Sequence, residues 1–310
     1  MSKPLIIGLA LDMDYLIFSA MSASESEMDW GDDVWTLECD HKQARSIMYG
    51  TIKQLKKEIA KQLEAKYPKL KAPGAYEFKD ICVISGKGNF RMDILETYKG
   101  NRVAKRKPVG YPAFCESTME HYEGQGVDNA FRWNGVEGDD VIGILMTKPE
   151  MAGCDRVIGV SCDKDFNTIP GDFFWITKME LVRNSLEDAD KWHMRQTLMG
   201  DTTDGYGGVP GVGEAFEGCL MKWLDAPKIY EQYEHEFLRG PRKGQTETRV
   251  RSLELGENTN GLSLWDCMVT LAQSQGMSEE DLLVQARVAR ILRASDWDFQ
   301  KQEPILFVPR

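Results

Sequence analysis

Apolar residues along the chain follow two kinds of pattern, and together these predict its secondary structure. Short and nearly uninterrupted apolar runs are typical of strands buried on both faces of a sheet, and they occupy residues 5–11, 80–85, 157–162 and 173–177. Apolar residues spaced three or four positions apart are typical of helices, and this spacing covers residues 41–67, 111–122, 141–146, 192–200, 214–224 and 279–293. Because these strands and helices alternate, we predict an α/β fold with a mostly parallel central sheet covered by helices.

The pattern changes near residue 185, which predicts two parts. Residues 1–185 contain the predicted strands and should form the α/β core. Residues 186–310 are expected to form a mainly helical lobe that packs on this core. Within the second part, residues 239–261 are polar and show little periodicity, so we predict a loop there.

Acidic residues follow two of the predicted strands at the points where those strands end. Asp12 ends the first strand, and Asp163 and Asp165 follow the third. In a parallel α/β sheet the carboxyl ends of the strands share one edge, and ligands bind beyond that edge. Residues i and i+2 of an extended segment also point to the same side. We therefore expect these three carboxylates to lie together.

Two further groups of acids lie near the ends of predicted helices. Glu137, Asp139 and Asp140, in the segment WNGVEGDDVIGIL, precede a helix expected to start near residue 141 at the same edge of the sheet. Asp201 and Asp204 are three positions apart, a spacing that one helical turn brings to a single face. Each acid taken singly fits an ordinary helix cap or turn. One cap needs one acid, however, so the whole set points to another role.

Eight such carboxylates would repel one another strongly unless cations were bound. Hard divalent ions prefer oxygen ligands, and no histidine accompanies these acids, so Mg²⁺ or Mn²⁺ fits better than zinc. Two such ions about 4 Å apart form a centre that cleaves phosphodiesters. A calcium-sensor loop at DTTDGYGG is excluded, because Thr203 and Gly205 stand where that loop needs oxygen-rich acids.

Composition narrows the class of protein further. Hydrophobic residues make up 42% of the chain, enough for a large core, and no apolar run is long enough to span a bilayer, so we expect no membrane partner. Seven scattered cysteines without a C-x-x-C pair favour a reducing cytoplasm and no disulfide framework. The net charge of −11 alone argues against a nucleic-acid partner. The proposed site carboxylates account for most of this charge, however, and the basic residues are locally clustered.

Basic residues and glycines form the remaining patterns. One basic stretch lies beside Tyr98 and consists of Lys99, Arg102, Lys105, Arg106 and Lys107. Cations beside a metal site neutralise charge on a transferring phosphate, and an aromatic beside cations suits a single nucleic-acid strand. Glycines after residue 204 let the backbone approach phosphate oxygens closely. A second set, Arg287, Arg290 and Arg293, predicts a basic stripe on one helix. A solvated loop or helix face remains the alternative for each pattern.

Five motifs, in this order, resemble the 5′→3′ nuclease family that includes flap endonucleases and the 5′-nuclease domain of DNA polymerase I. They are DMDYLIF, FRMDILETYKGNR, VEGDD, SCDKDF and GDTTDGYGGVPGVG. The later segments LWDC, GMSEEDLL and ARILR look like the exonucleases of short-tailed lytic phages within that family. The resemblance covers roughly residues 9–293. It implies a basic helical arch near residues 86–110 and a helix–three-turn–helix near residues 195–225.

The resemblance also implies roles for individual residues. It implies two Mg²⁺ ions, for which Mn²⁺ could substitute, and assigns as metal-site residues Asp12, Glu137, Asp139, Asp140, Asp163, Asp165, Asp201 and Asp204. It implies that Lys99 and Arg102 act on the scissile phosphate, and that K⁺ binds at the helix–three-turn–helix. The DNA-binding residues it suggests are Arg91, Tyr98, Lys105, Arg106, Lys107, Gly205, Gly208, Gly211 and Gly213.

One departure from the family pattern lies in the segment ISGKGNFR. Family members often carry an acid shortly before the positions of Phe90 and Arg91, whereas this chain has Ser85 and Gly86 in that region. The family acid lies near the metals, so its absence puts one outer contact in doubt. The main set of acids is complete, so we still expect an active enzyme.

The expected function is metal-dependent 5′→3′ exonuclease activity on duplex DNA with a free 5′ end. The resemblance further implies cleavage of 5′ flaps and of the RNA strand of RNA/DNA hybrids. It implies roles in primer removal and host-DNA breakdown during phage replication, alongside phage replication proteins. Two alternatives stay open: a ribonuclease of the related PIN class, and a non-catalytic protein that binds branched DNA.

Overall fold

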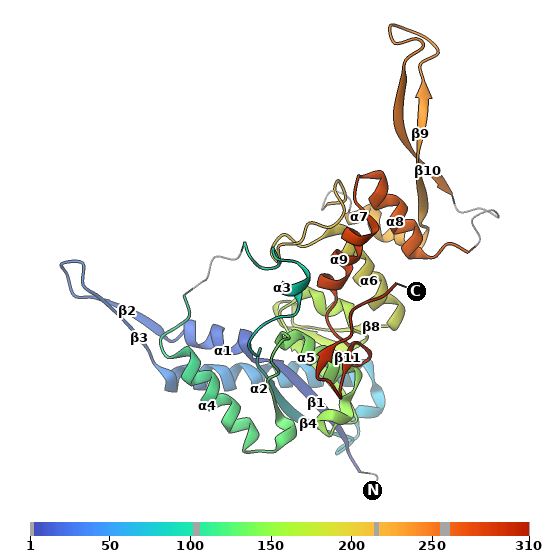
Figure 1. Cartoon of the computed structure of the whole chain (residues 1–310). Coiled ribbons are helices and arrows are strands. Elements are labelled where there is room, and N and C mark those ends of the chain that lie inside the picture. The colour runs from blue at the N-terminus through green and yellow to red at the C-terminus, as the bar shows by residue number, and fades with distance from the viewer. Residues whose placement is uncertain (1–2, 102–105, 214–216, 255–260, 310) are drawn as a thin grey trace. The chain divides into compact units, whose positions relative to one another are not determined.

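The computed structural model describes residues 3–101, 106–213, 217–254 and 261–309 (Figure 1). Two compact units are distinguished by their internal packing. Unit 1 consists of Met1–Phe90, Ala104–Ala189 and Ile291–Ile305, and unit 2 consists of Arg91–Val103, Asp190–Arg290 and Leu306–Arg310. The sequence had suggested two consecutive parts divided near residue 185. In the structure the chain instead enters unit 2 at Arg91, returns, and enters it again at Asp190.

A six-stranded sheet forms the centre of unit 1, with the strand order β5-β4-β1-β6-β7-β8. Its strands are β1 (Leu5–Asp12), β4 (Tyr76–Val83), β5 (Ala130–Phe131), β6 (Arg156–Ser161), β7 (Gly171–Trp175) and β8 (Glu180–Asn184). Parallel pairing joins neighbouring strands from β5 through β4, β1 and β6 to β7, and β8 pairs antiparallel with β7. The predicted α/β fold with a mostly parallel sheet is therefore confirmed.

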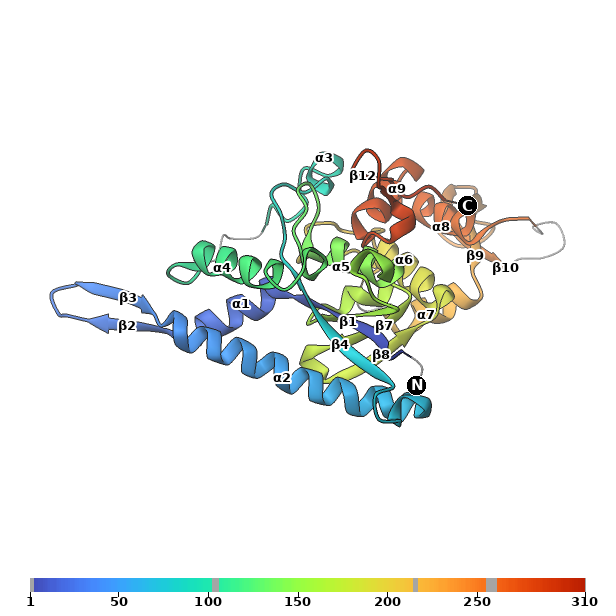
Figure 2. The same ribbon diagram turned by 90° about the horizontal axis from the view of Figure 1, so that it is seen from below.

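Helices cover both faces of this sheet, as Figures 1 and 2 show. In β1 alternate side chains point to opposite faces, so Ile7, Leu9 and Leu11 join one hydrophobic cluster and Ala10 joins another. The first cluster contains residues of α1 (Met13–Ser22), α2 (His41–Lys66) and α4 (Tyr111–Glu123). The second contains residues of α5 (Gly138–Thr147) and of the returning C-terminal segment. Both faces are thus buried, which explains why the strands are nearly continuous apolar runs.

The long helix α2 shows how spacing produces this packing. Its buried side chains recur every three or four residues, so they form one stripe against the sheet: Ala44, Met48, Ile52, Leu55, Ile59 and Leu63. Asp40 caps its start by accepting the N–H groups of Lys42 and Gln43, both at 2.9 Å. Pro68 follows its end, where the chain continues as a short 3₁₀ helix.

A hairpin of β2 (Glu25–Asp29) and β3 (Trp35–Cys39) was not foreseen from the sequence. It extends away from the other elements of unit 1 in both views (Figures 1 and 2). Most of its residues are exposed. A two-stranded ribbon of this kind buries no face, so it leaves no alternating apolar pattern by which the sequence could reveal it.

Unit 2 is built mainly from helices around its own hydrophobic cluster. These are α3 (Arg91–Ile94), α6 (Leu186–Met199), α7 (Glu217–Asp225), α8 (Leu264–Ser274) and α9 (Glu279–Ala289), of which α6 starts in unit 1. The cluster takes side chains from α6, α7, α8 and α9, among them Leu198, Leu220, Met268 and Leu282. The helical character expected for the second part of the chain is present in these elements.

The loop predicted for residues 239–261 is wrong in its first part. The chain forms a hairpin of β9 (Lys228–Glu236) and β10 (Thr246–Glu254) joined by a turn, while residues 255–260 lie outside the described part of the chain. Polar cross-strand contacts support this hairpin, including the bond from the Thr248 hydroxyl to Glu234 at 2.6 Å and the pairing of Arg251 with Glu231. The sequence lacked the apolar alternation that we required for a strand.

The remaining elements are short. They are the strands β11 (Trp297–Asp298) and β12 (Glu303–Pro304), and the 3₁₀ helices η1 (Pro68–Lys71), η2 (Val127–Asn129), η3 (Pro149–Ala152), η4 (Lys164–Thr168), η5 (Ile176–Lys178) and η8 (Ala294–Asp296). None of the helices in the described ranges combines the length and the apolar character needed to cross a membrane.

Candidate active site

The carboxyl ends of β1 and β6 lie side by side in unit 1 and bring two of the predicted acids together. Asp12 ends β1, accepts the N–H of Tyr15 at 3.2 Å, and accepts the hydroxyl of Ser161 at 2.8 Å. Ser161 ends β6, and its hydroxyl in turn accepts the N–H of Asp163 at 3.2 Å. One hydroxyl group therefore joins Asp12 to Asp163.

Asp163 also positions the next acid. It precedes η4, and its side chain accepts the N–H of Asp165 at 2.8 Å, as an N-cap residue does. Asp165 lies in the first turn of η4 and is half-buried. The predicted grouping of these carboxylates at one edge of the sheet is thus present within unit 1.

The third acidic segment forms the start of α5, one turn earlier than we expected. The helix begins at Gly138 with Glu137 as its N-cap, rather than near residue 141. Asp140 is fully buried, and its oxygens accept the N–H of Glu137 at 3.1 Å and the N–H of Leu292 at 3.0 Å. Asp140 therefore holds the helix start and the C-terminal segment together. Its role at a metal site stays a prediction.

Asp14 and Ser85 join this edge, and the sequence reasoning did not select Asp14. The N–H of Ser85 donates to Oδ2 of Asp14 at 2.8 Å, and the Ser85 hydroxyl accepts the N–H of Gly138 at 2.9 Å. A carboxylate thus lies beside the position where the family pattern has an acid and this chain has serine. The i, i+2 spacing that selected Asp163 and Asp165 also relates Asp12 to Asp14, and could have identified it.

The electrostatics of unit 1 show that these acids act on one another. Burial raises the pKa of Asp12 to about 6, with Asp14 and Asp163 adding to the shift, although hydrogen bonds from Ser161 and Tyr15 oppose it. Burial likewise raises the pKa of the Cys162 thiol to about 12, and the charges of Asp12, Asp163 and Asp139 add to it. Carboxylates from three separate segments therefore concentrate negative charge at this edge.

The chemistry of this donor set fits a hard divalent cation. Its groups are carboxylate oxygens, which Mg²⁺ and Mn²⁺ prefer, and a cation would favour the ionised form of Asp12, whose pKa is raised first by burial and further by Asp14 and Asp163. Within the described ranges, no three acidic, histidine or cysteine side chains are close enough together to hold one ion.

Asp201 and Asp204 lie in unit 2, in a loop rather than on a helical turn as we had predicted. Helix α6 ends at Met199, and a pair of backbone bonds between Asp201 and Tyr206, at 2.9 and 3.2 Å, closes the loop. Oδ1 of Asp201 accepts the N–H of Thr203 at 2.8 Å. The residues DTTDGY thus form a tight turn, because Gly205 allows the chain to reverse.

The segment that contains Lys99 packs against this loop within unit 2. The N–H of Lys99 donates to the carbonyl of Asp204 at 2.7 Å, and its Nζ lies 3.8 Å from Oδ2 of Asp204. Thr97 donates to the Gly205 carbonyl at 3.1 Å, and Asn101 donates to the Thr202 carbonyl. A predicted phosphate-binding cation therefore lies beside a predicted metal ligand. Arg102 and Lys105, also predicted to contact DNA or phosphate, lie outside the described residues.

Two residues that we expected to bind DNA are buried within unit 2. The Arg91 side chain is 2% exposed and donates to the carbonyls of Val288 and Arg290. Tyr98 is 3% exposed, and its hydroxyl lies 3.3 Å from Oδ2 of Asp204. In this structure the Arg91 guanidinium donates to backbone carbonyls and the Tyr98 ring is covered. DNA contact by either residue stays a prediction.

Arg106 and Lys107 belong to unit 1 and are exposed. Arg106 pairs with Glu25, and its hydrogen bonds, with help from the Val109 N–H, lower the pKa of Glu25 to about 2. Nζ of Lys107 lies 4.4 Å from the centre of the Tyr111 ring. Contacts of Arg106 and Lys107 with DNA stay predictions.

The predicted arginine stripe is wrong. Helix α9 ends at Ala289, so Arg290 and Arg293 lie beyond it. Both are buried, and Arg293 donates to the carbonyl of Thr168 within unit 1. Arg287 donates to the carbonyl of Phe307 within unit 2 at 3.3 Å. The spacing in the sequence was helical, but Arg287 and Arg293 donate to backbone carbonyls and Arg290 lies 3.8 Å from the Asp190 carboxylate, so the three form no solvated basic face.

Two of the glycines after Asp204 are required by close backbone packing. Gly205 has φ +77°, and a β-carbon there would lie 2.3 Å from the carbonyl oxygen of Thr97. Gly208 has φ +63°, and a β-carbon there would lie 2.3 Å from the backbone nitrogen of Gly200. Gly211 and Gly213 follow in the same loop and are exposed. Contact of this backbone with phosphates or K⁺ stays a prediction.

Known proteins resemble this chain in sequence and in fold. No protein-family model matches the chain. Over 306 residues it is 36% identical to the exodeoxyribonuclease of Enterobacteria phage T3, covering 97% of this chain and 93% of the relative. It is also 36% identical over 305 residues to the exonuclease of Escherichia phage T7, with the same coverage. The fold is similar to that in a crystal structure of the T5 D15 protein, co-crystallized with metal ions, with a TM-score of 0.50 and 17% sequence identity. The similarity covers 92% of this chain and 89% of the T5 D15 chain, and it supports the fold.

Proposed function

Because this chain belongs to the 5′→3′ exonuclease family of the phage T3 and T7 enzymes, we propose that it is a metal-dependent 5′→3′ exonuclease acting on duplex DNA. The observation that carries the proposal is the clustering of carboxylates from β1, β6 and α5 at one edge of unit 1, where burial and like charge raise the pKa of Asp12 to about 6. A compensating charge would stabilise such an arrangement at neutral pH, and divalent cations can provide it.

The predicted acids are assigned to two metal sites. The first Mg²⁺ or Mn²⁺ would be surrounded by Asp12, Glu137, Asp139 and Asp140. Asp140 also holds the start of α5 through its hydrogen bonds. The second ion would be bound by the remaining four acids, Asp163, Asp165, Asp201 and Asp204. When bound, such a pair of cations polarises the phosphate and makes water nucleophilic near neutral pH.

The protein's own side chains would orient the substrate and balance its charge. Lys99 would approach the scissile phosphate, because its Nζ already lies 3.8 Å from the Asp204 carboxylate. A fixed cation there stabilises the extra negative charge that develops as water attacks the phosphorus in line with the leaving oxygen. We assign the same role to Arg102. The described side chains suggest no activated serine or cysteine, so we propose direct hydrolysis without a covalent enzyme intermediate.

The proposed substrates follow the same assignment. They are duplex DNA with a free 5′ end, 5′ flaps, and the RNA strand of RNA/DNA hybrids. The turns that contain Gly205 and Gly208 would bind duplex phosphates through backbone N–H groups, with K⁺ as a possible companion ion. In a phage-infected cell these activities would remove primers and degrade host DNA, together with phage replication proteins.

A substrate panel tests this proposal against its two rivals. Equal amounts of protein are incubated in Mg²⁺ with duplex DNA, an RNA/DNA hybrid and single-stranded RNA of the same sequence. The proposal predicts rapid cleavage of the duplex and the hybrid and little cleavage of single-stranded RNA. Preferred cleavage of single-stranded RNA would instead identify a PIN-type ribonuclease. A band shift without cleavage in Mg²⁺ would identify a non-catalytic DNA-binding protein.

Replacing Lys99 tests the assignment of its charge. Lys99→Met keeps the length of the side chain and removes the cation, so turnover on duplex DNA should fall about 10²- to 10³-fold. DNA affinity should change much less, because the contact is made mainly in the transition state. Single-turnover rates and binding titrations measure the two quantities. Lys53→Met, at an exposed residue of α2 in unit 1, is the matched control. Equal turnover of Lys99→Met and the control would refute the role of Lys99.

A further inference from the structure

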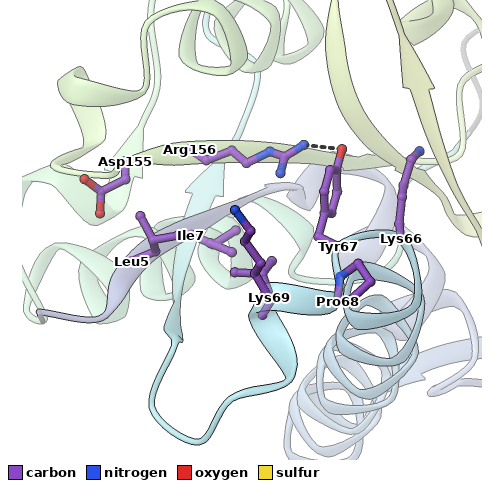
Figure 3. A pocket seen from close by; sticks show the side chains of 9 residues that line it. Leu5, Ile7, Lys66, Tyr67, Pro68, Lys69, Asp155 and Arg156 are labelled. Carbon is purple, nitrogen blue, oxygen red and sulfur yellow. Dashed lines mark hydrogen bonds between the residues drawn. The ribbon is translucent and has the colours of Figure 1, made fainter. Parts of the chain in front are cut away.

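A cavity of about 550 Å³ lies in unit 1 at the amino end of the parallel strands (Figure 3). Its lining includes Leu5 and Ile7 from the start of β1, and Arg156 from the start of β6. The acidic edge begins at Asp12, the other end of β1. Seven residue steps of an extended strand separate Leu5 from Asp12, about 23 Å. The cavity is therefore distinct from the candidate active site.

The walls of this cavity combine apolar surface with positive charge. Leu5, Ile7, Pro68 and Leu70 form the apolar part. Lys66, Lys69 and Arg156 contribute three cations and Asp155 one carboxylate, so the formal charge of the lining is +3 − 1 = +2. Oδ2 of Asp155 accepts the backbone N–H of Ile6 at 2.8 Å, which fixes that carboxylate in place.

The cations are fixed around one buried carboxylate. Asp172 is 1% exposed and pairs with Lys66 at 3.5 Å, with Arg183 at 3.3 Å, and with Arg156. The Arg156 guanidinium lies 4.6 Å from the centre of the Tyr67 ring and donates to its hydroxyl at 2.9 Å (Figure 3). Three cations thus share a single negative charge, and Arg156 is held in position before any ligand arrives.

Positive charge at this site exceeds negative charge. Burial lowers the pKa of Lys66, and the neighbouring Arg183 and Arg156 lower it further, although Glu180 acts in the opposite direction. Burial also lowers the pKa of Arg156, with Arg183 again contributing. The Lys69 side chain points across the cavity toward Arg156 in Figure 3 and forms no ion pair with any residue in the described ranges. An anion would relieve this imbalance.

We propose that this cavity binds a nucleoside 5′-monophosphate, with the phosphate between Lys69 and Arg156 and the nucleoside against Leu5, Ile7 and Leu70. A phosphate monoester carries a charge of about −1.5 to −2 at neutral pH, which matches the +2 of the lining. The volume lies within the range typical of small-molecule sites. The choice of a nucleotide rests on the proposed function, since a 5′→3′ exonuclease releases nucleotides.

Isothermal titration of the full chain with deoxyadenosine monophosphate, in EDTA, tests this proposal without any cleavage step. Saturable one-site binding is expected, and both deoxyadenosine and inorganic phosphate should bind at least about tenfold more weakly, because each lacks one half of the recognised group. Equal affinity for inorganic phosphate would reduce the site to an anion-binding patch and overturn the proposal. Absence of saturable binding would overturn it as well.

Variants place the binding at this cavity. Lys69→Ala should weaken binding about tenfold, because a charge-assisted contact is lost. Lys71→Ala lies on the same 3₁₀ turn, outside the lining, and should leave binding unchanged. Leu5→Trp should fill the apolar part at an exposed strand end and weaken binding without changing charge. Binding that neither Lys69→Ala nor Leu5→Trp affects would overturn the proposal.

The outcomes for the cavity and for the proposed function are separable. Nucleotide binding with no DNA cleavage would leave the cavity assignment standing and would refute the nuclease. Cleavage of DNA without nucleotide binding would refute only the cavity assignment.

Discussion

Asp165→Asn is expected to lower turnover on duplex DNA by about 10³- to 10⁵-fold while DNA affinity changes by less than about threefold. The amide keeps the shape of the side chain but removes the negative charge that a divalent cation requires. The position of residue 165 should persist, because its backbone N–H donates to Asp163 independently of the side chain. Single-turnover rates in Mg²⁺ and binding titrations with a labelled duplex measure the two effects.

A matched variant controls for a general effect of losing one carboxylate. Asp33 lies at the exposed turn of the β2–β3 hairpin with φ +60°, a conformation that asparagine also accepts. Asp33→Asn should therefore keep wild-type turnover. Asp201→Asn should behave like Asp165→Asn. Near wild-type turnover in both Asp165→Asn and Asp201→Asn would contradict the two-metal assignment.

Gly205→Ala should have the second large effect, through the backbone. Alanine disfavours the left-handed conformation at φ +77°, and its β-carbon would overlap the Thr97 carbonyl oxygen. We expect a loss of about 2 to 4 kcal/mol in the free energy of unfolding of unit 2. Because Thr97 and Lys99 both bond to this loop, turnover should also fall about 10²-fold. Urea denaturation and single-turnover kinetics measure the two losses.

Gly207→Ala provides the comparison two residues away. A β-carbon at Gly207 would meet no atom within 4 Å, and its φ lies outside the left-handed region. Its stability and turnover should stay near wild type. If Gly205→Ala and Gly207→Ala were equally stable and active, the close packing of Thr97 on Gly205 would not be what positions Lys99.

The sheet and its helices could be predicted because burial on both faces leaves a clear signal. The apolar run at residues 5–11 is β1, and the spacing at residues 41–67 is α2, each within a residue or two. The hairpins β2–β3 and β9–β10 were missed for the converse reason. Their strands pair with each other, and the side chains of β2, β3 and β9 are exposed or half-buried, so no apolar period marks them.

The site was predictable where side chains follow the ends of regular elements. Asp12 and Asp163 meet through Ser161 because β1 and β6 are adjacent and parallel. Exposure could not be predicted from residue type. Arg91 and Tyr98 were expected to face DNA, yet both side chains are buried and bond to other parts of unit 2. A basic or aromatic residue gives no sign in the sequence of whether it faces solvent or a carbonyl of a distant helix.

The acid-rich edge also explains why one departure from the family pattern need not abolish activity. Ser85 replaces an acid in the sequence, but its N–H bonds to Asp14 and its hydroxyl accepts the N–H of Gly138. A carboxylate is therefore still present beside the start of α5. It comes from the segment after β1 rather than from the segment after β4.

The most direct test is a time course on duplex DNA labelled at the 5′ end, run beside a copy labelled at the 3′ end, first in Mg²⁺ and then in EDTA. We expect early release of small labelled products from the 5′ label alone, and no release in EDTA. Early release from the 3′ label, or cleavage that persists in EDTA, would contradict the central claim that the carboxylates around Asp12 and Asp163 hold metal ions for 5′→3′ hydrolysis.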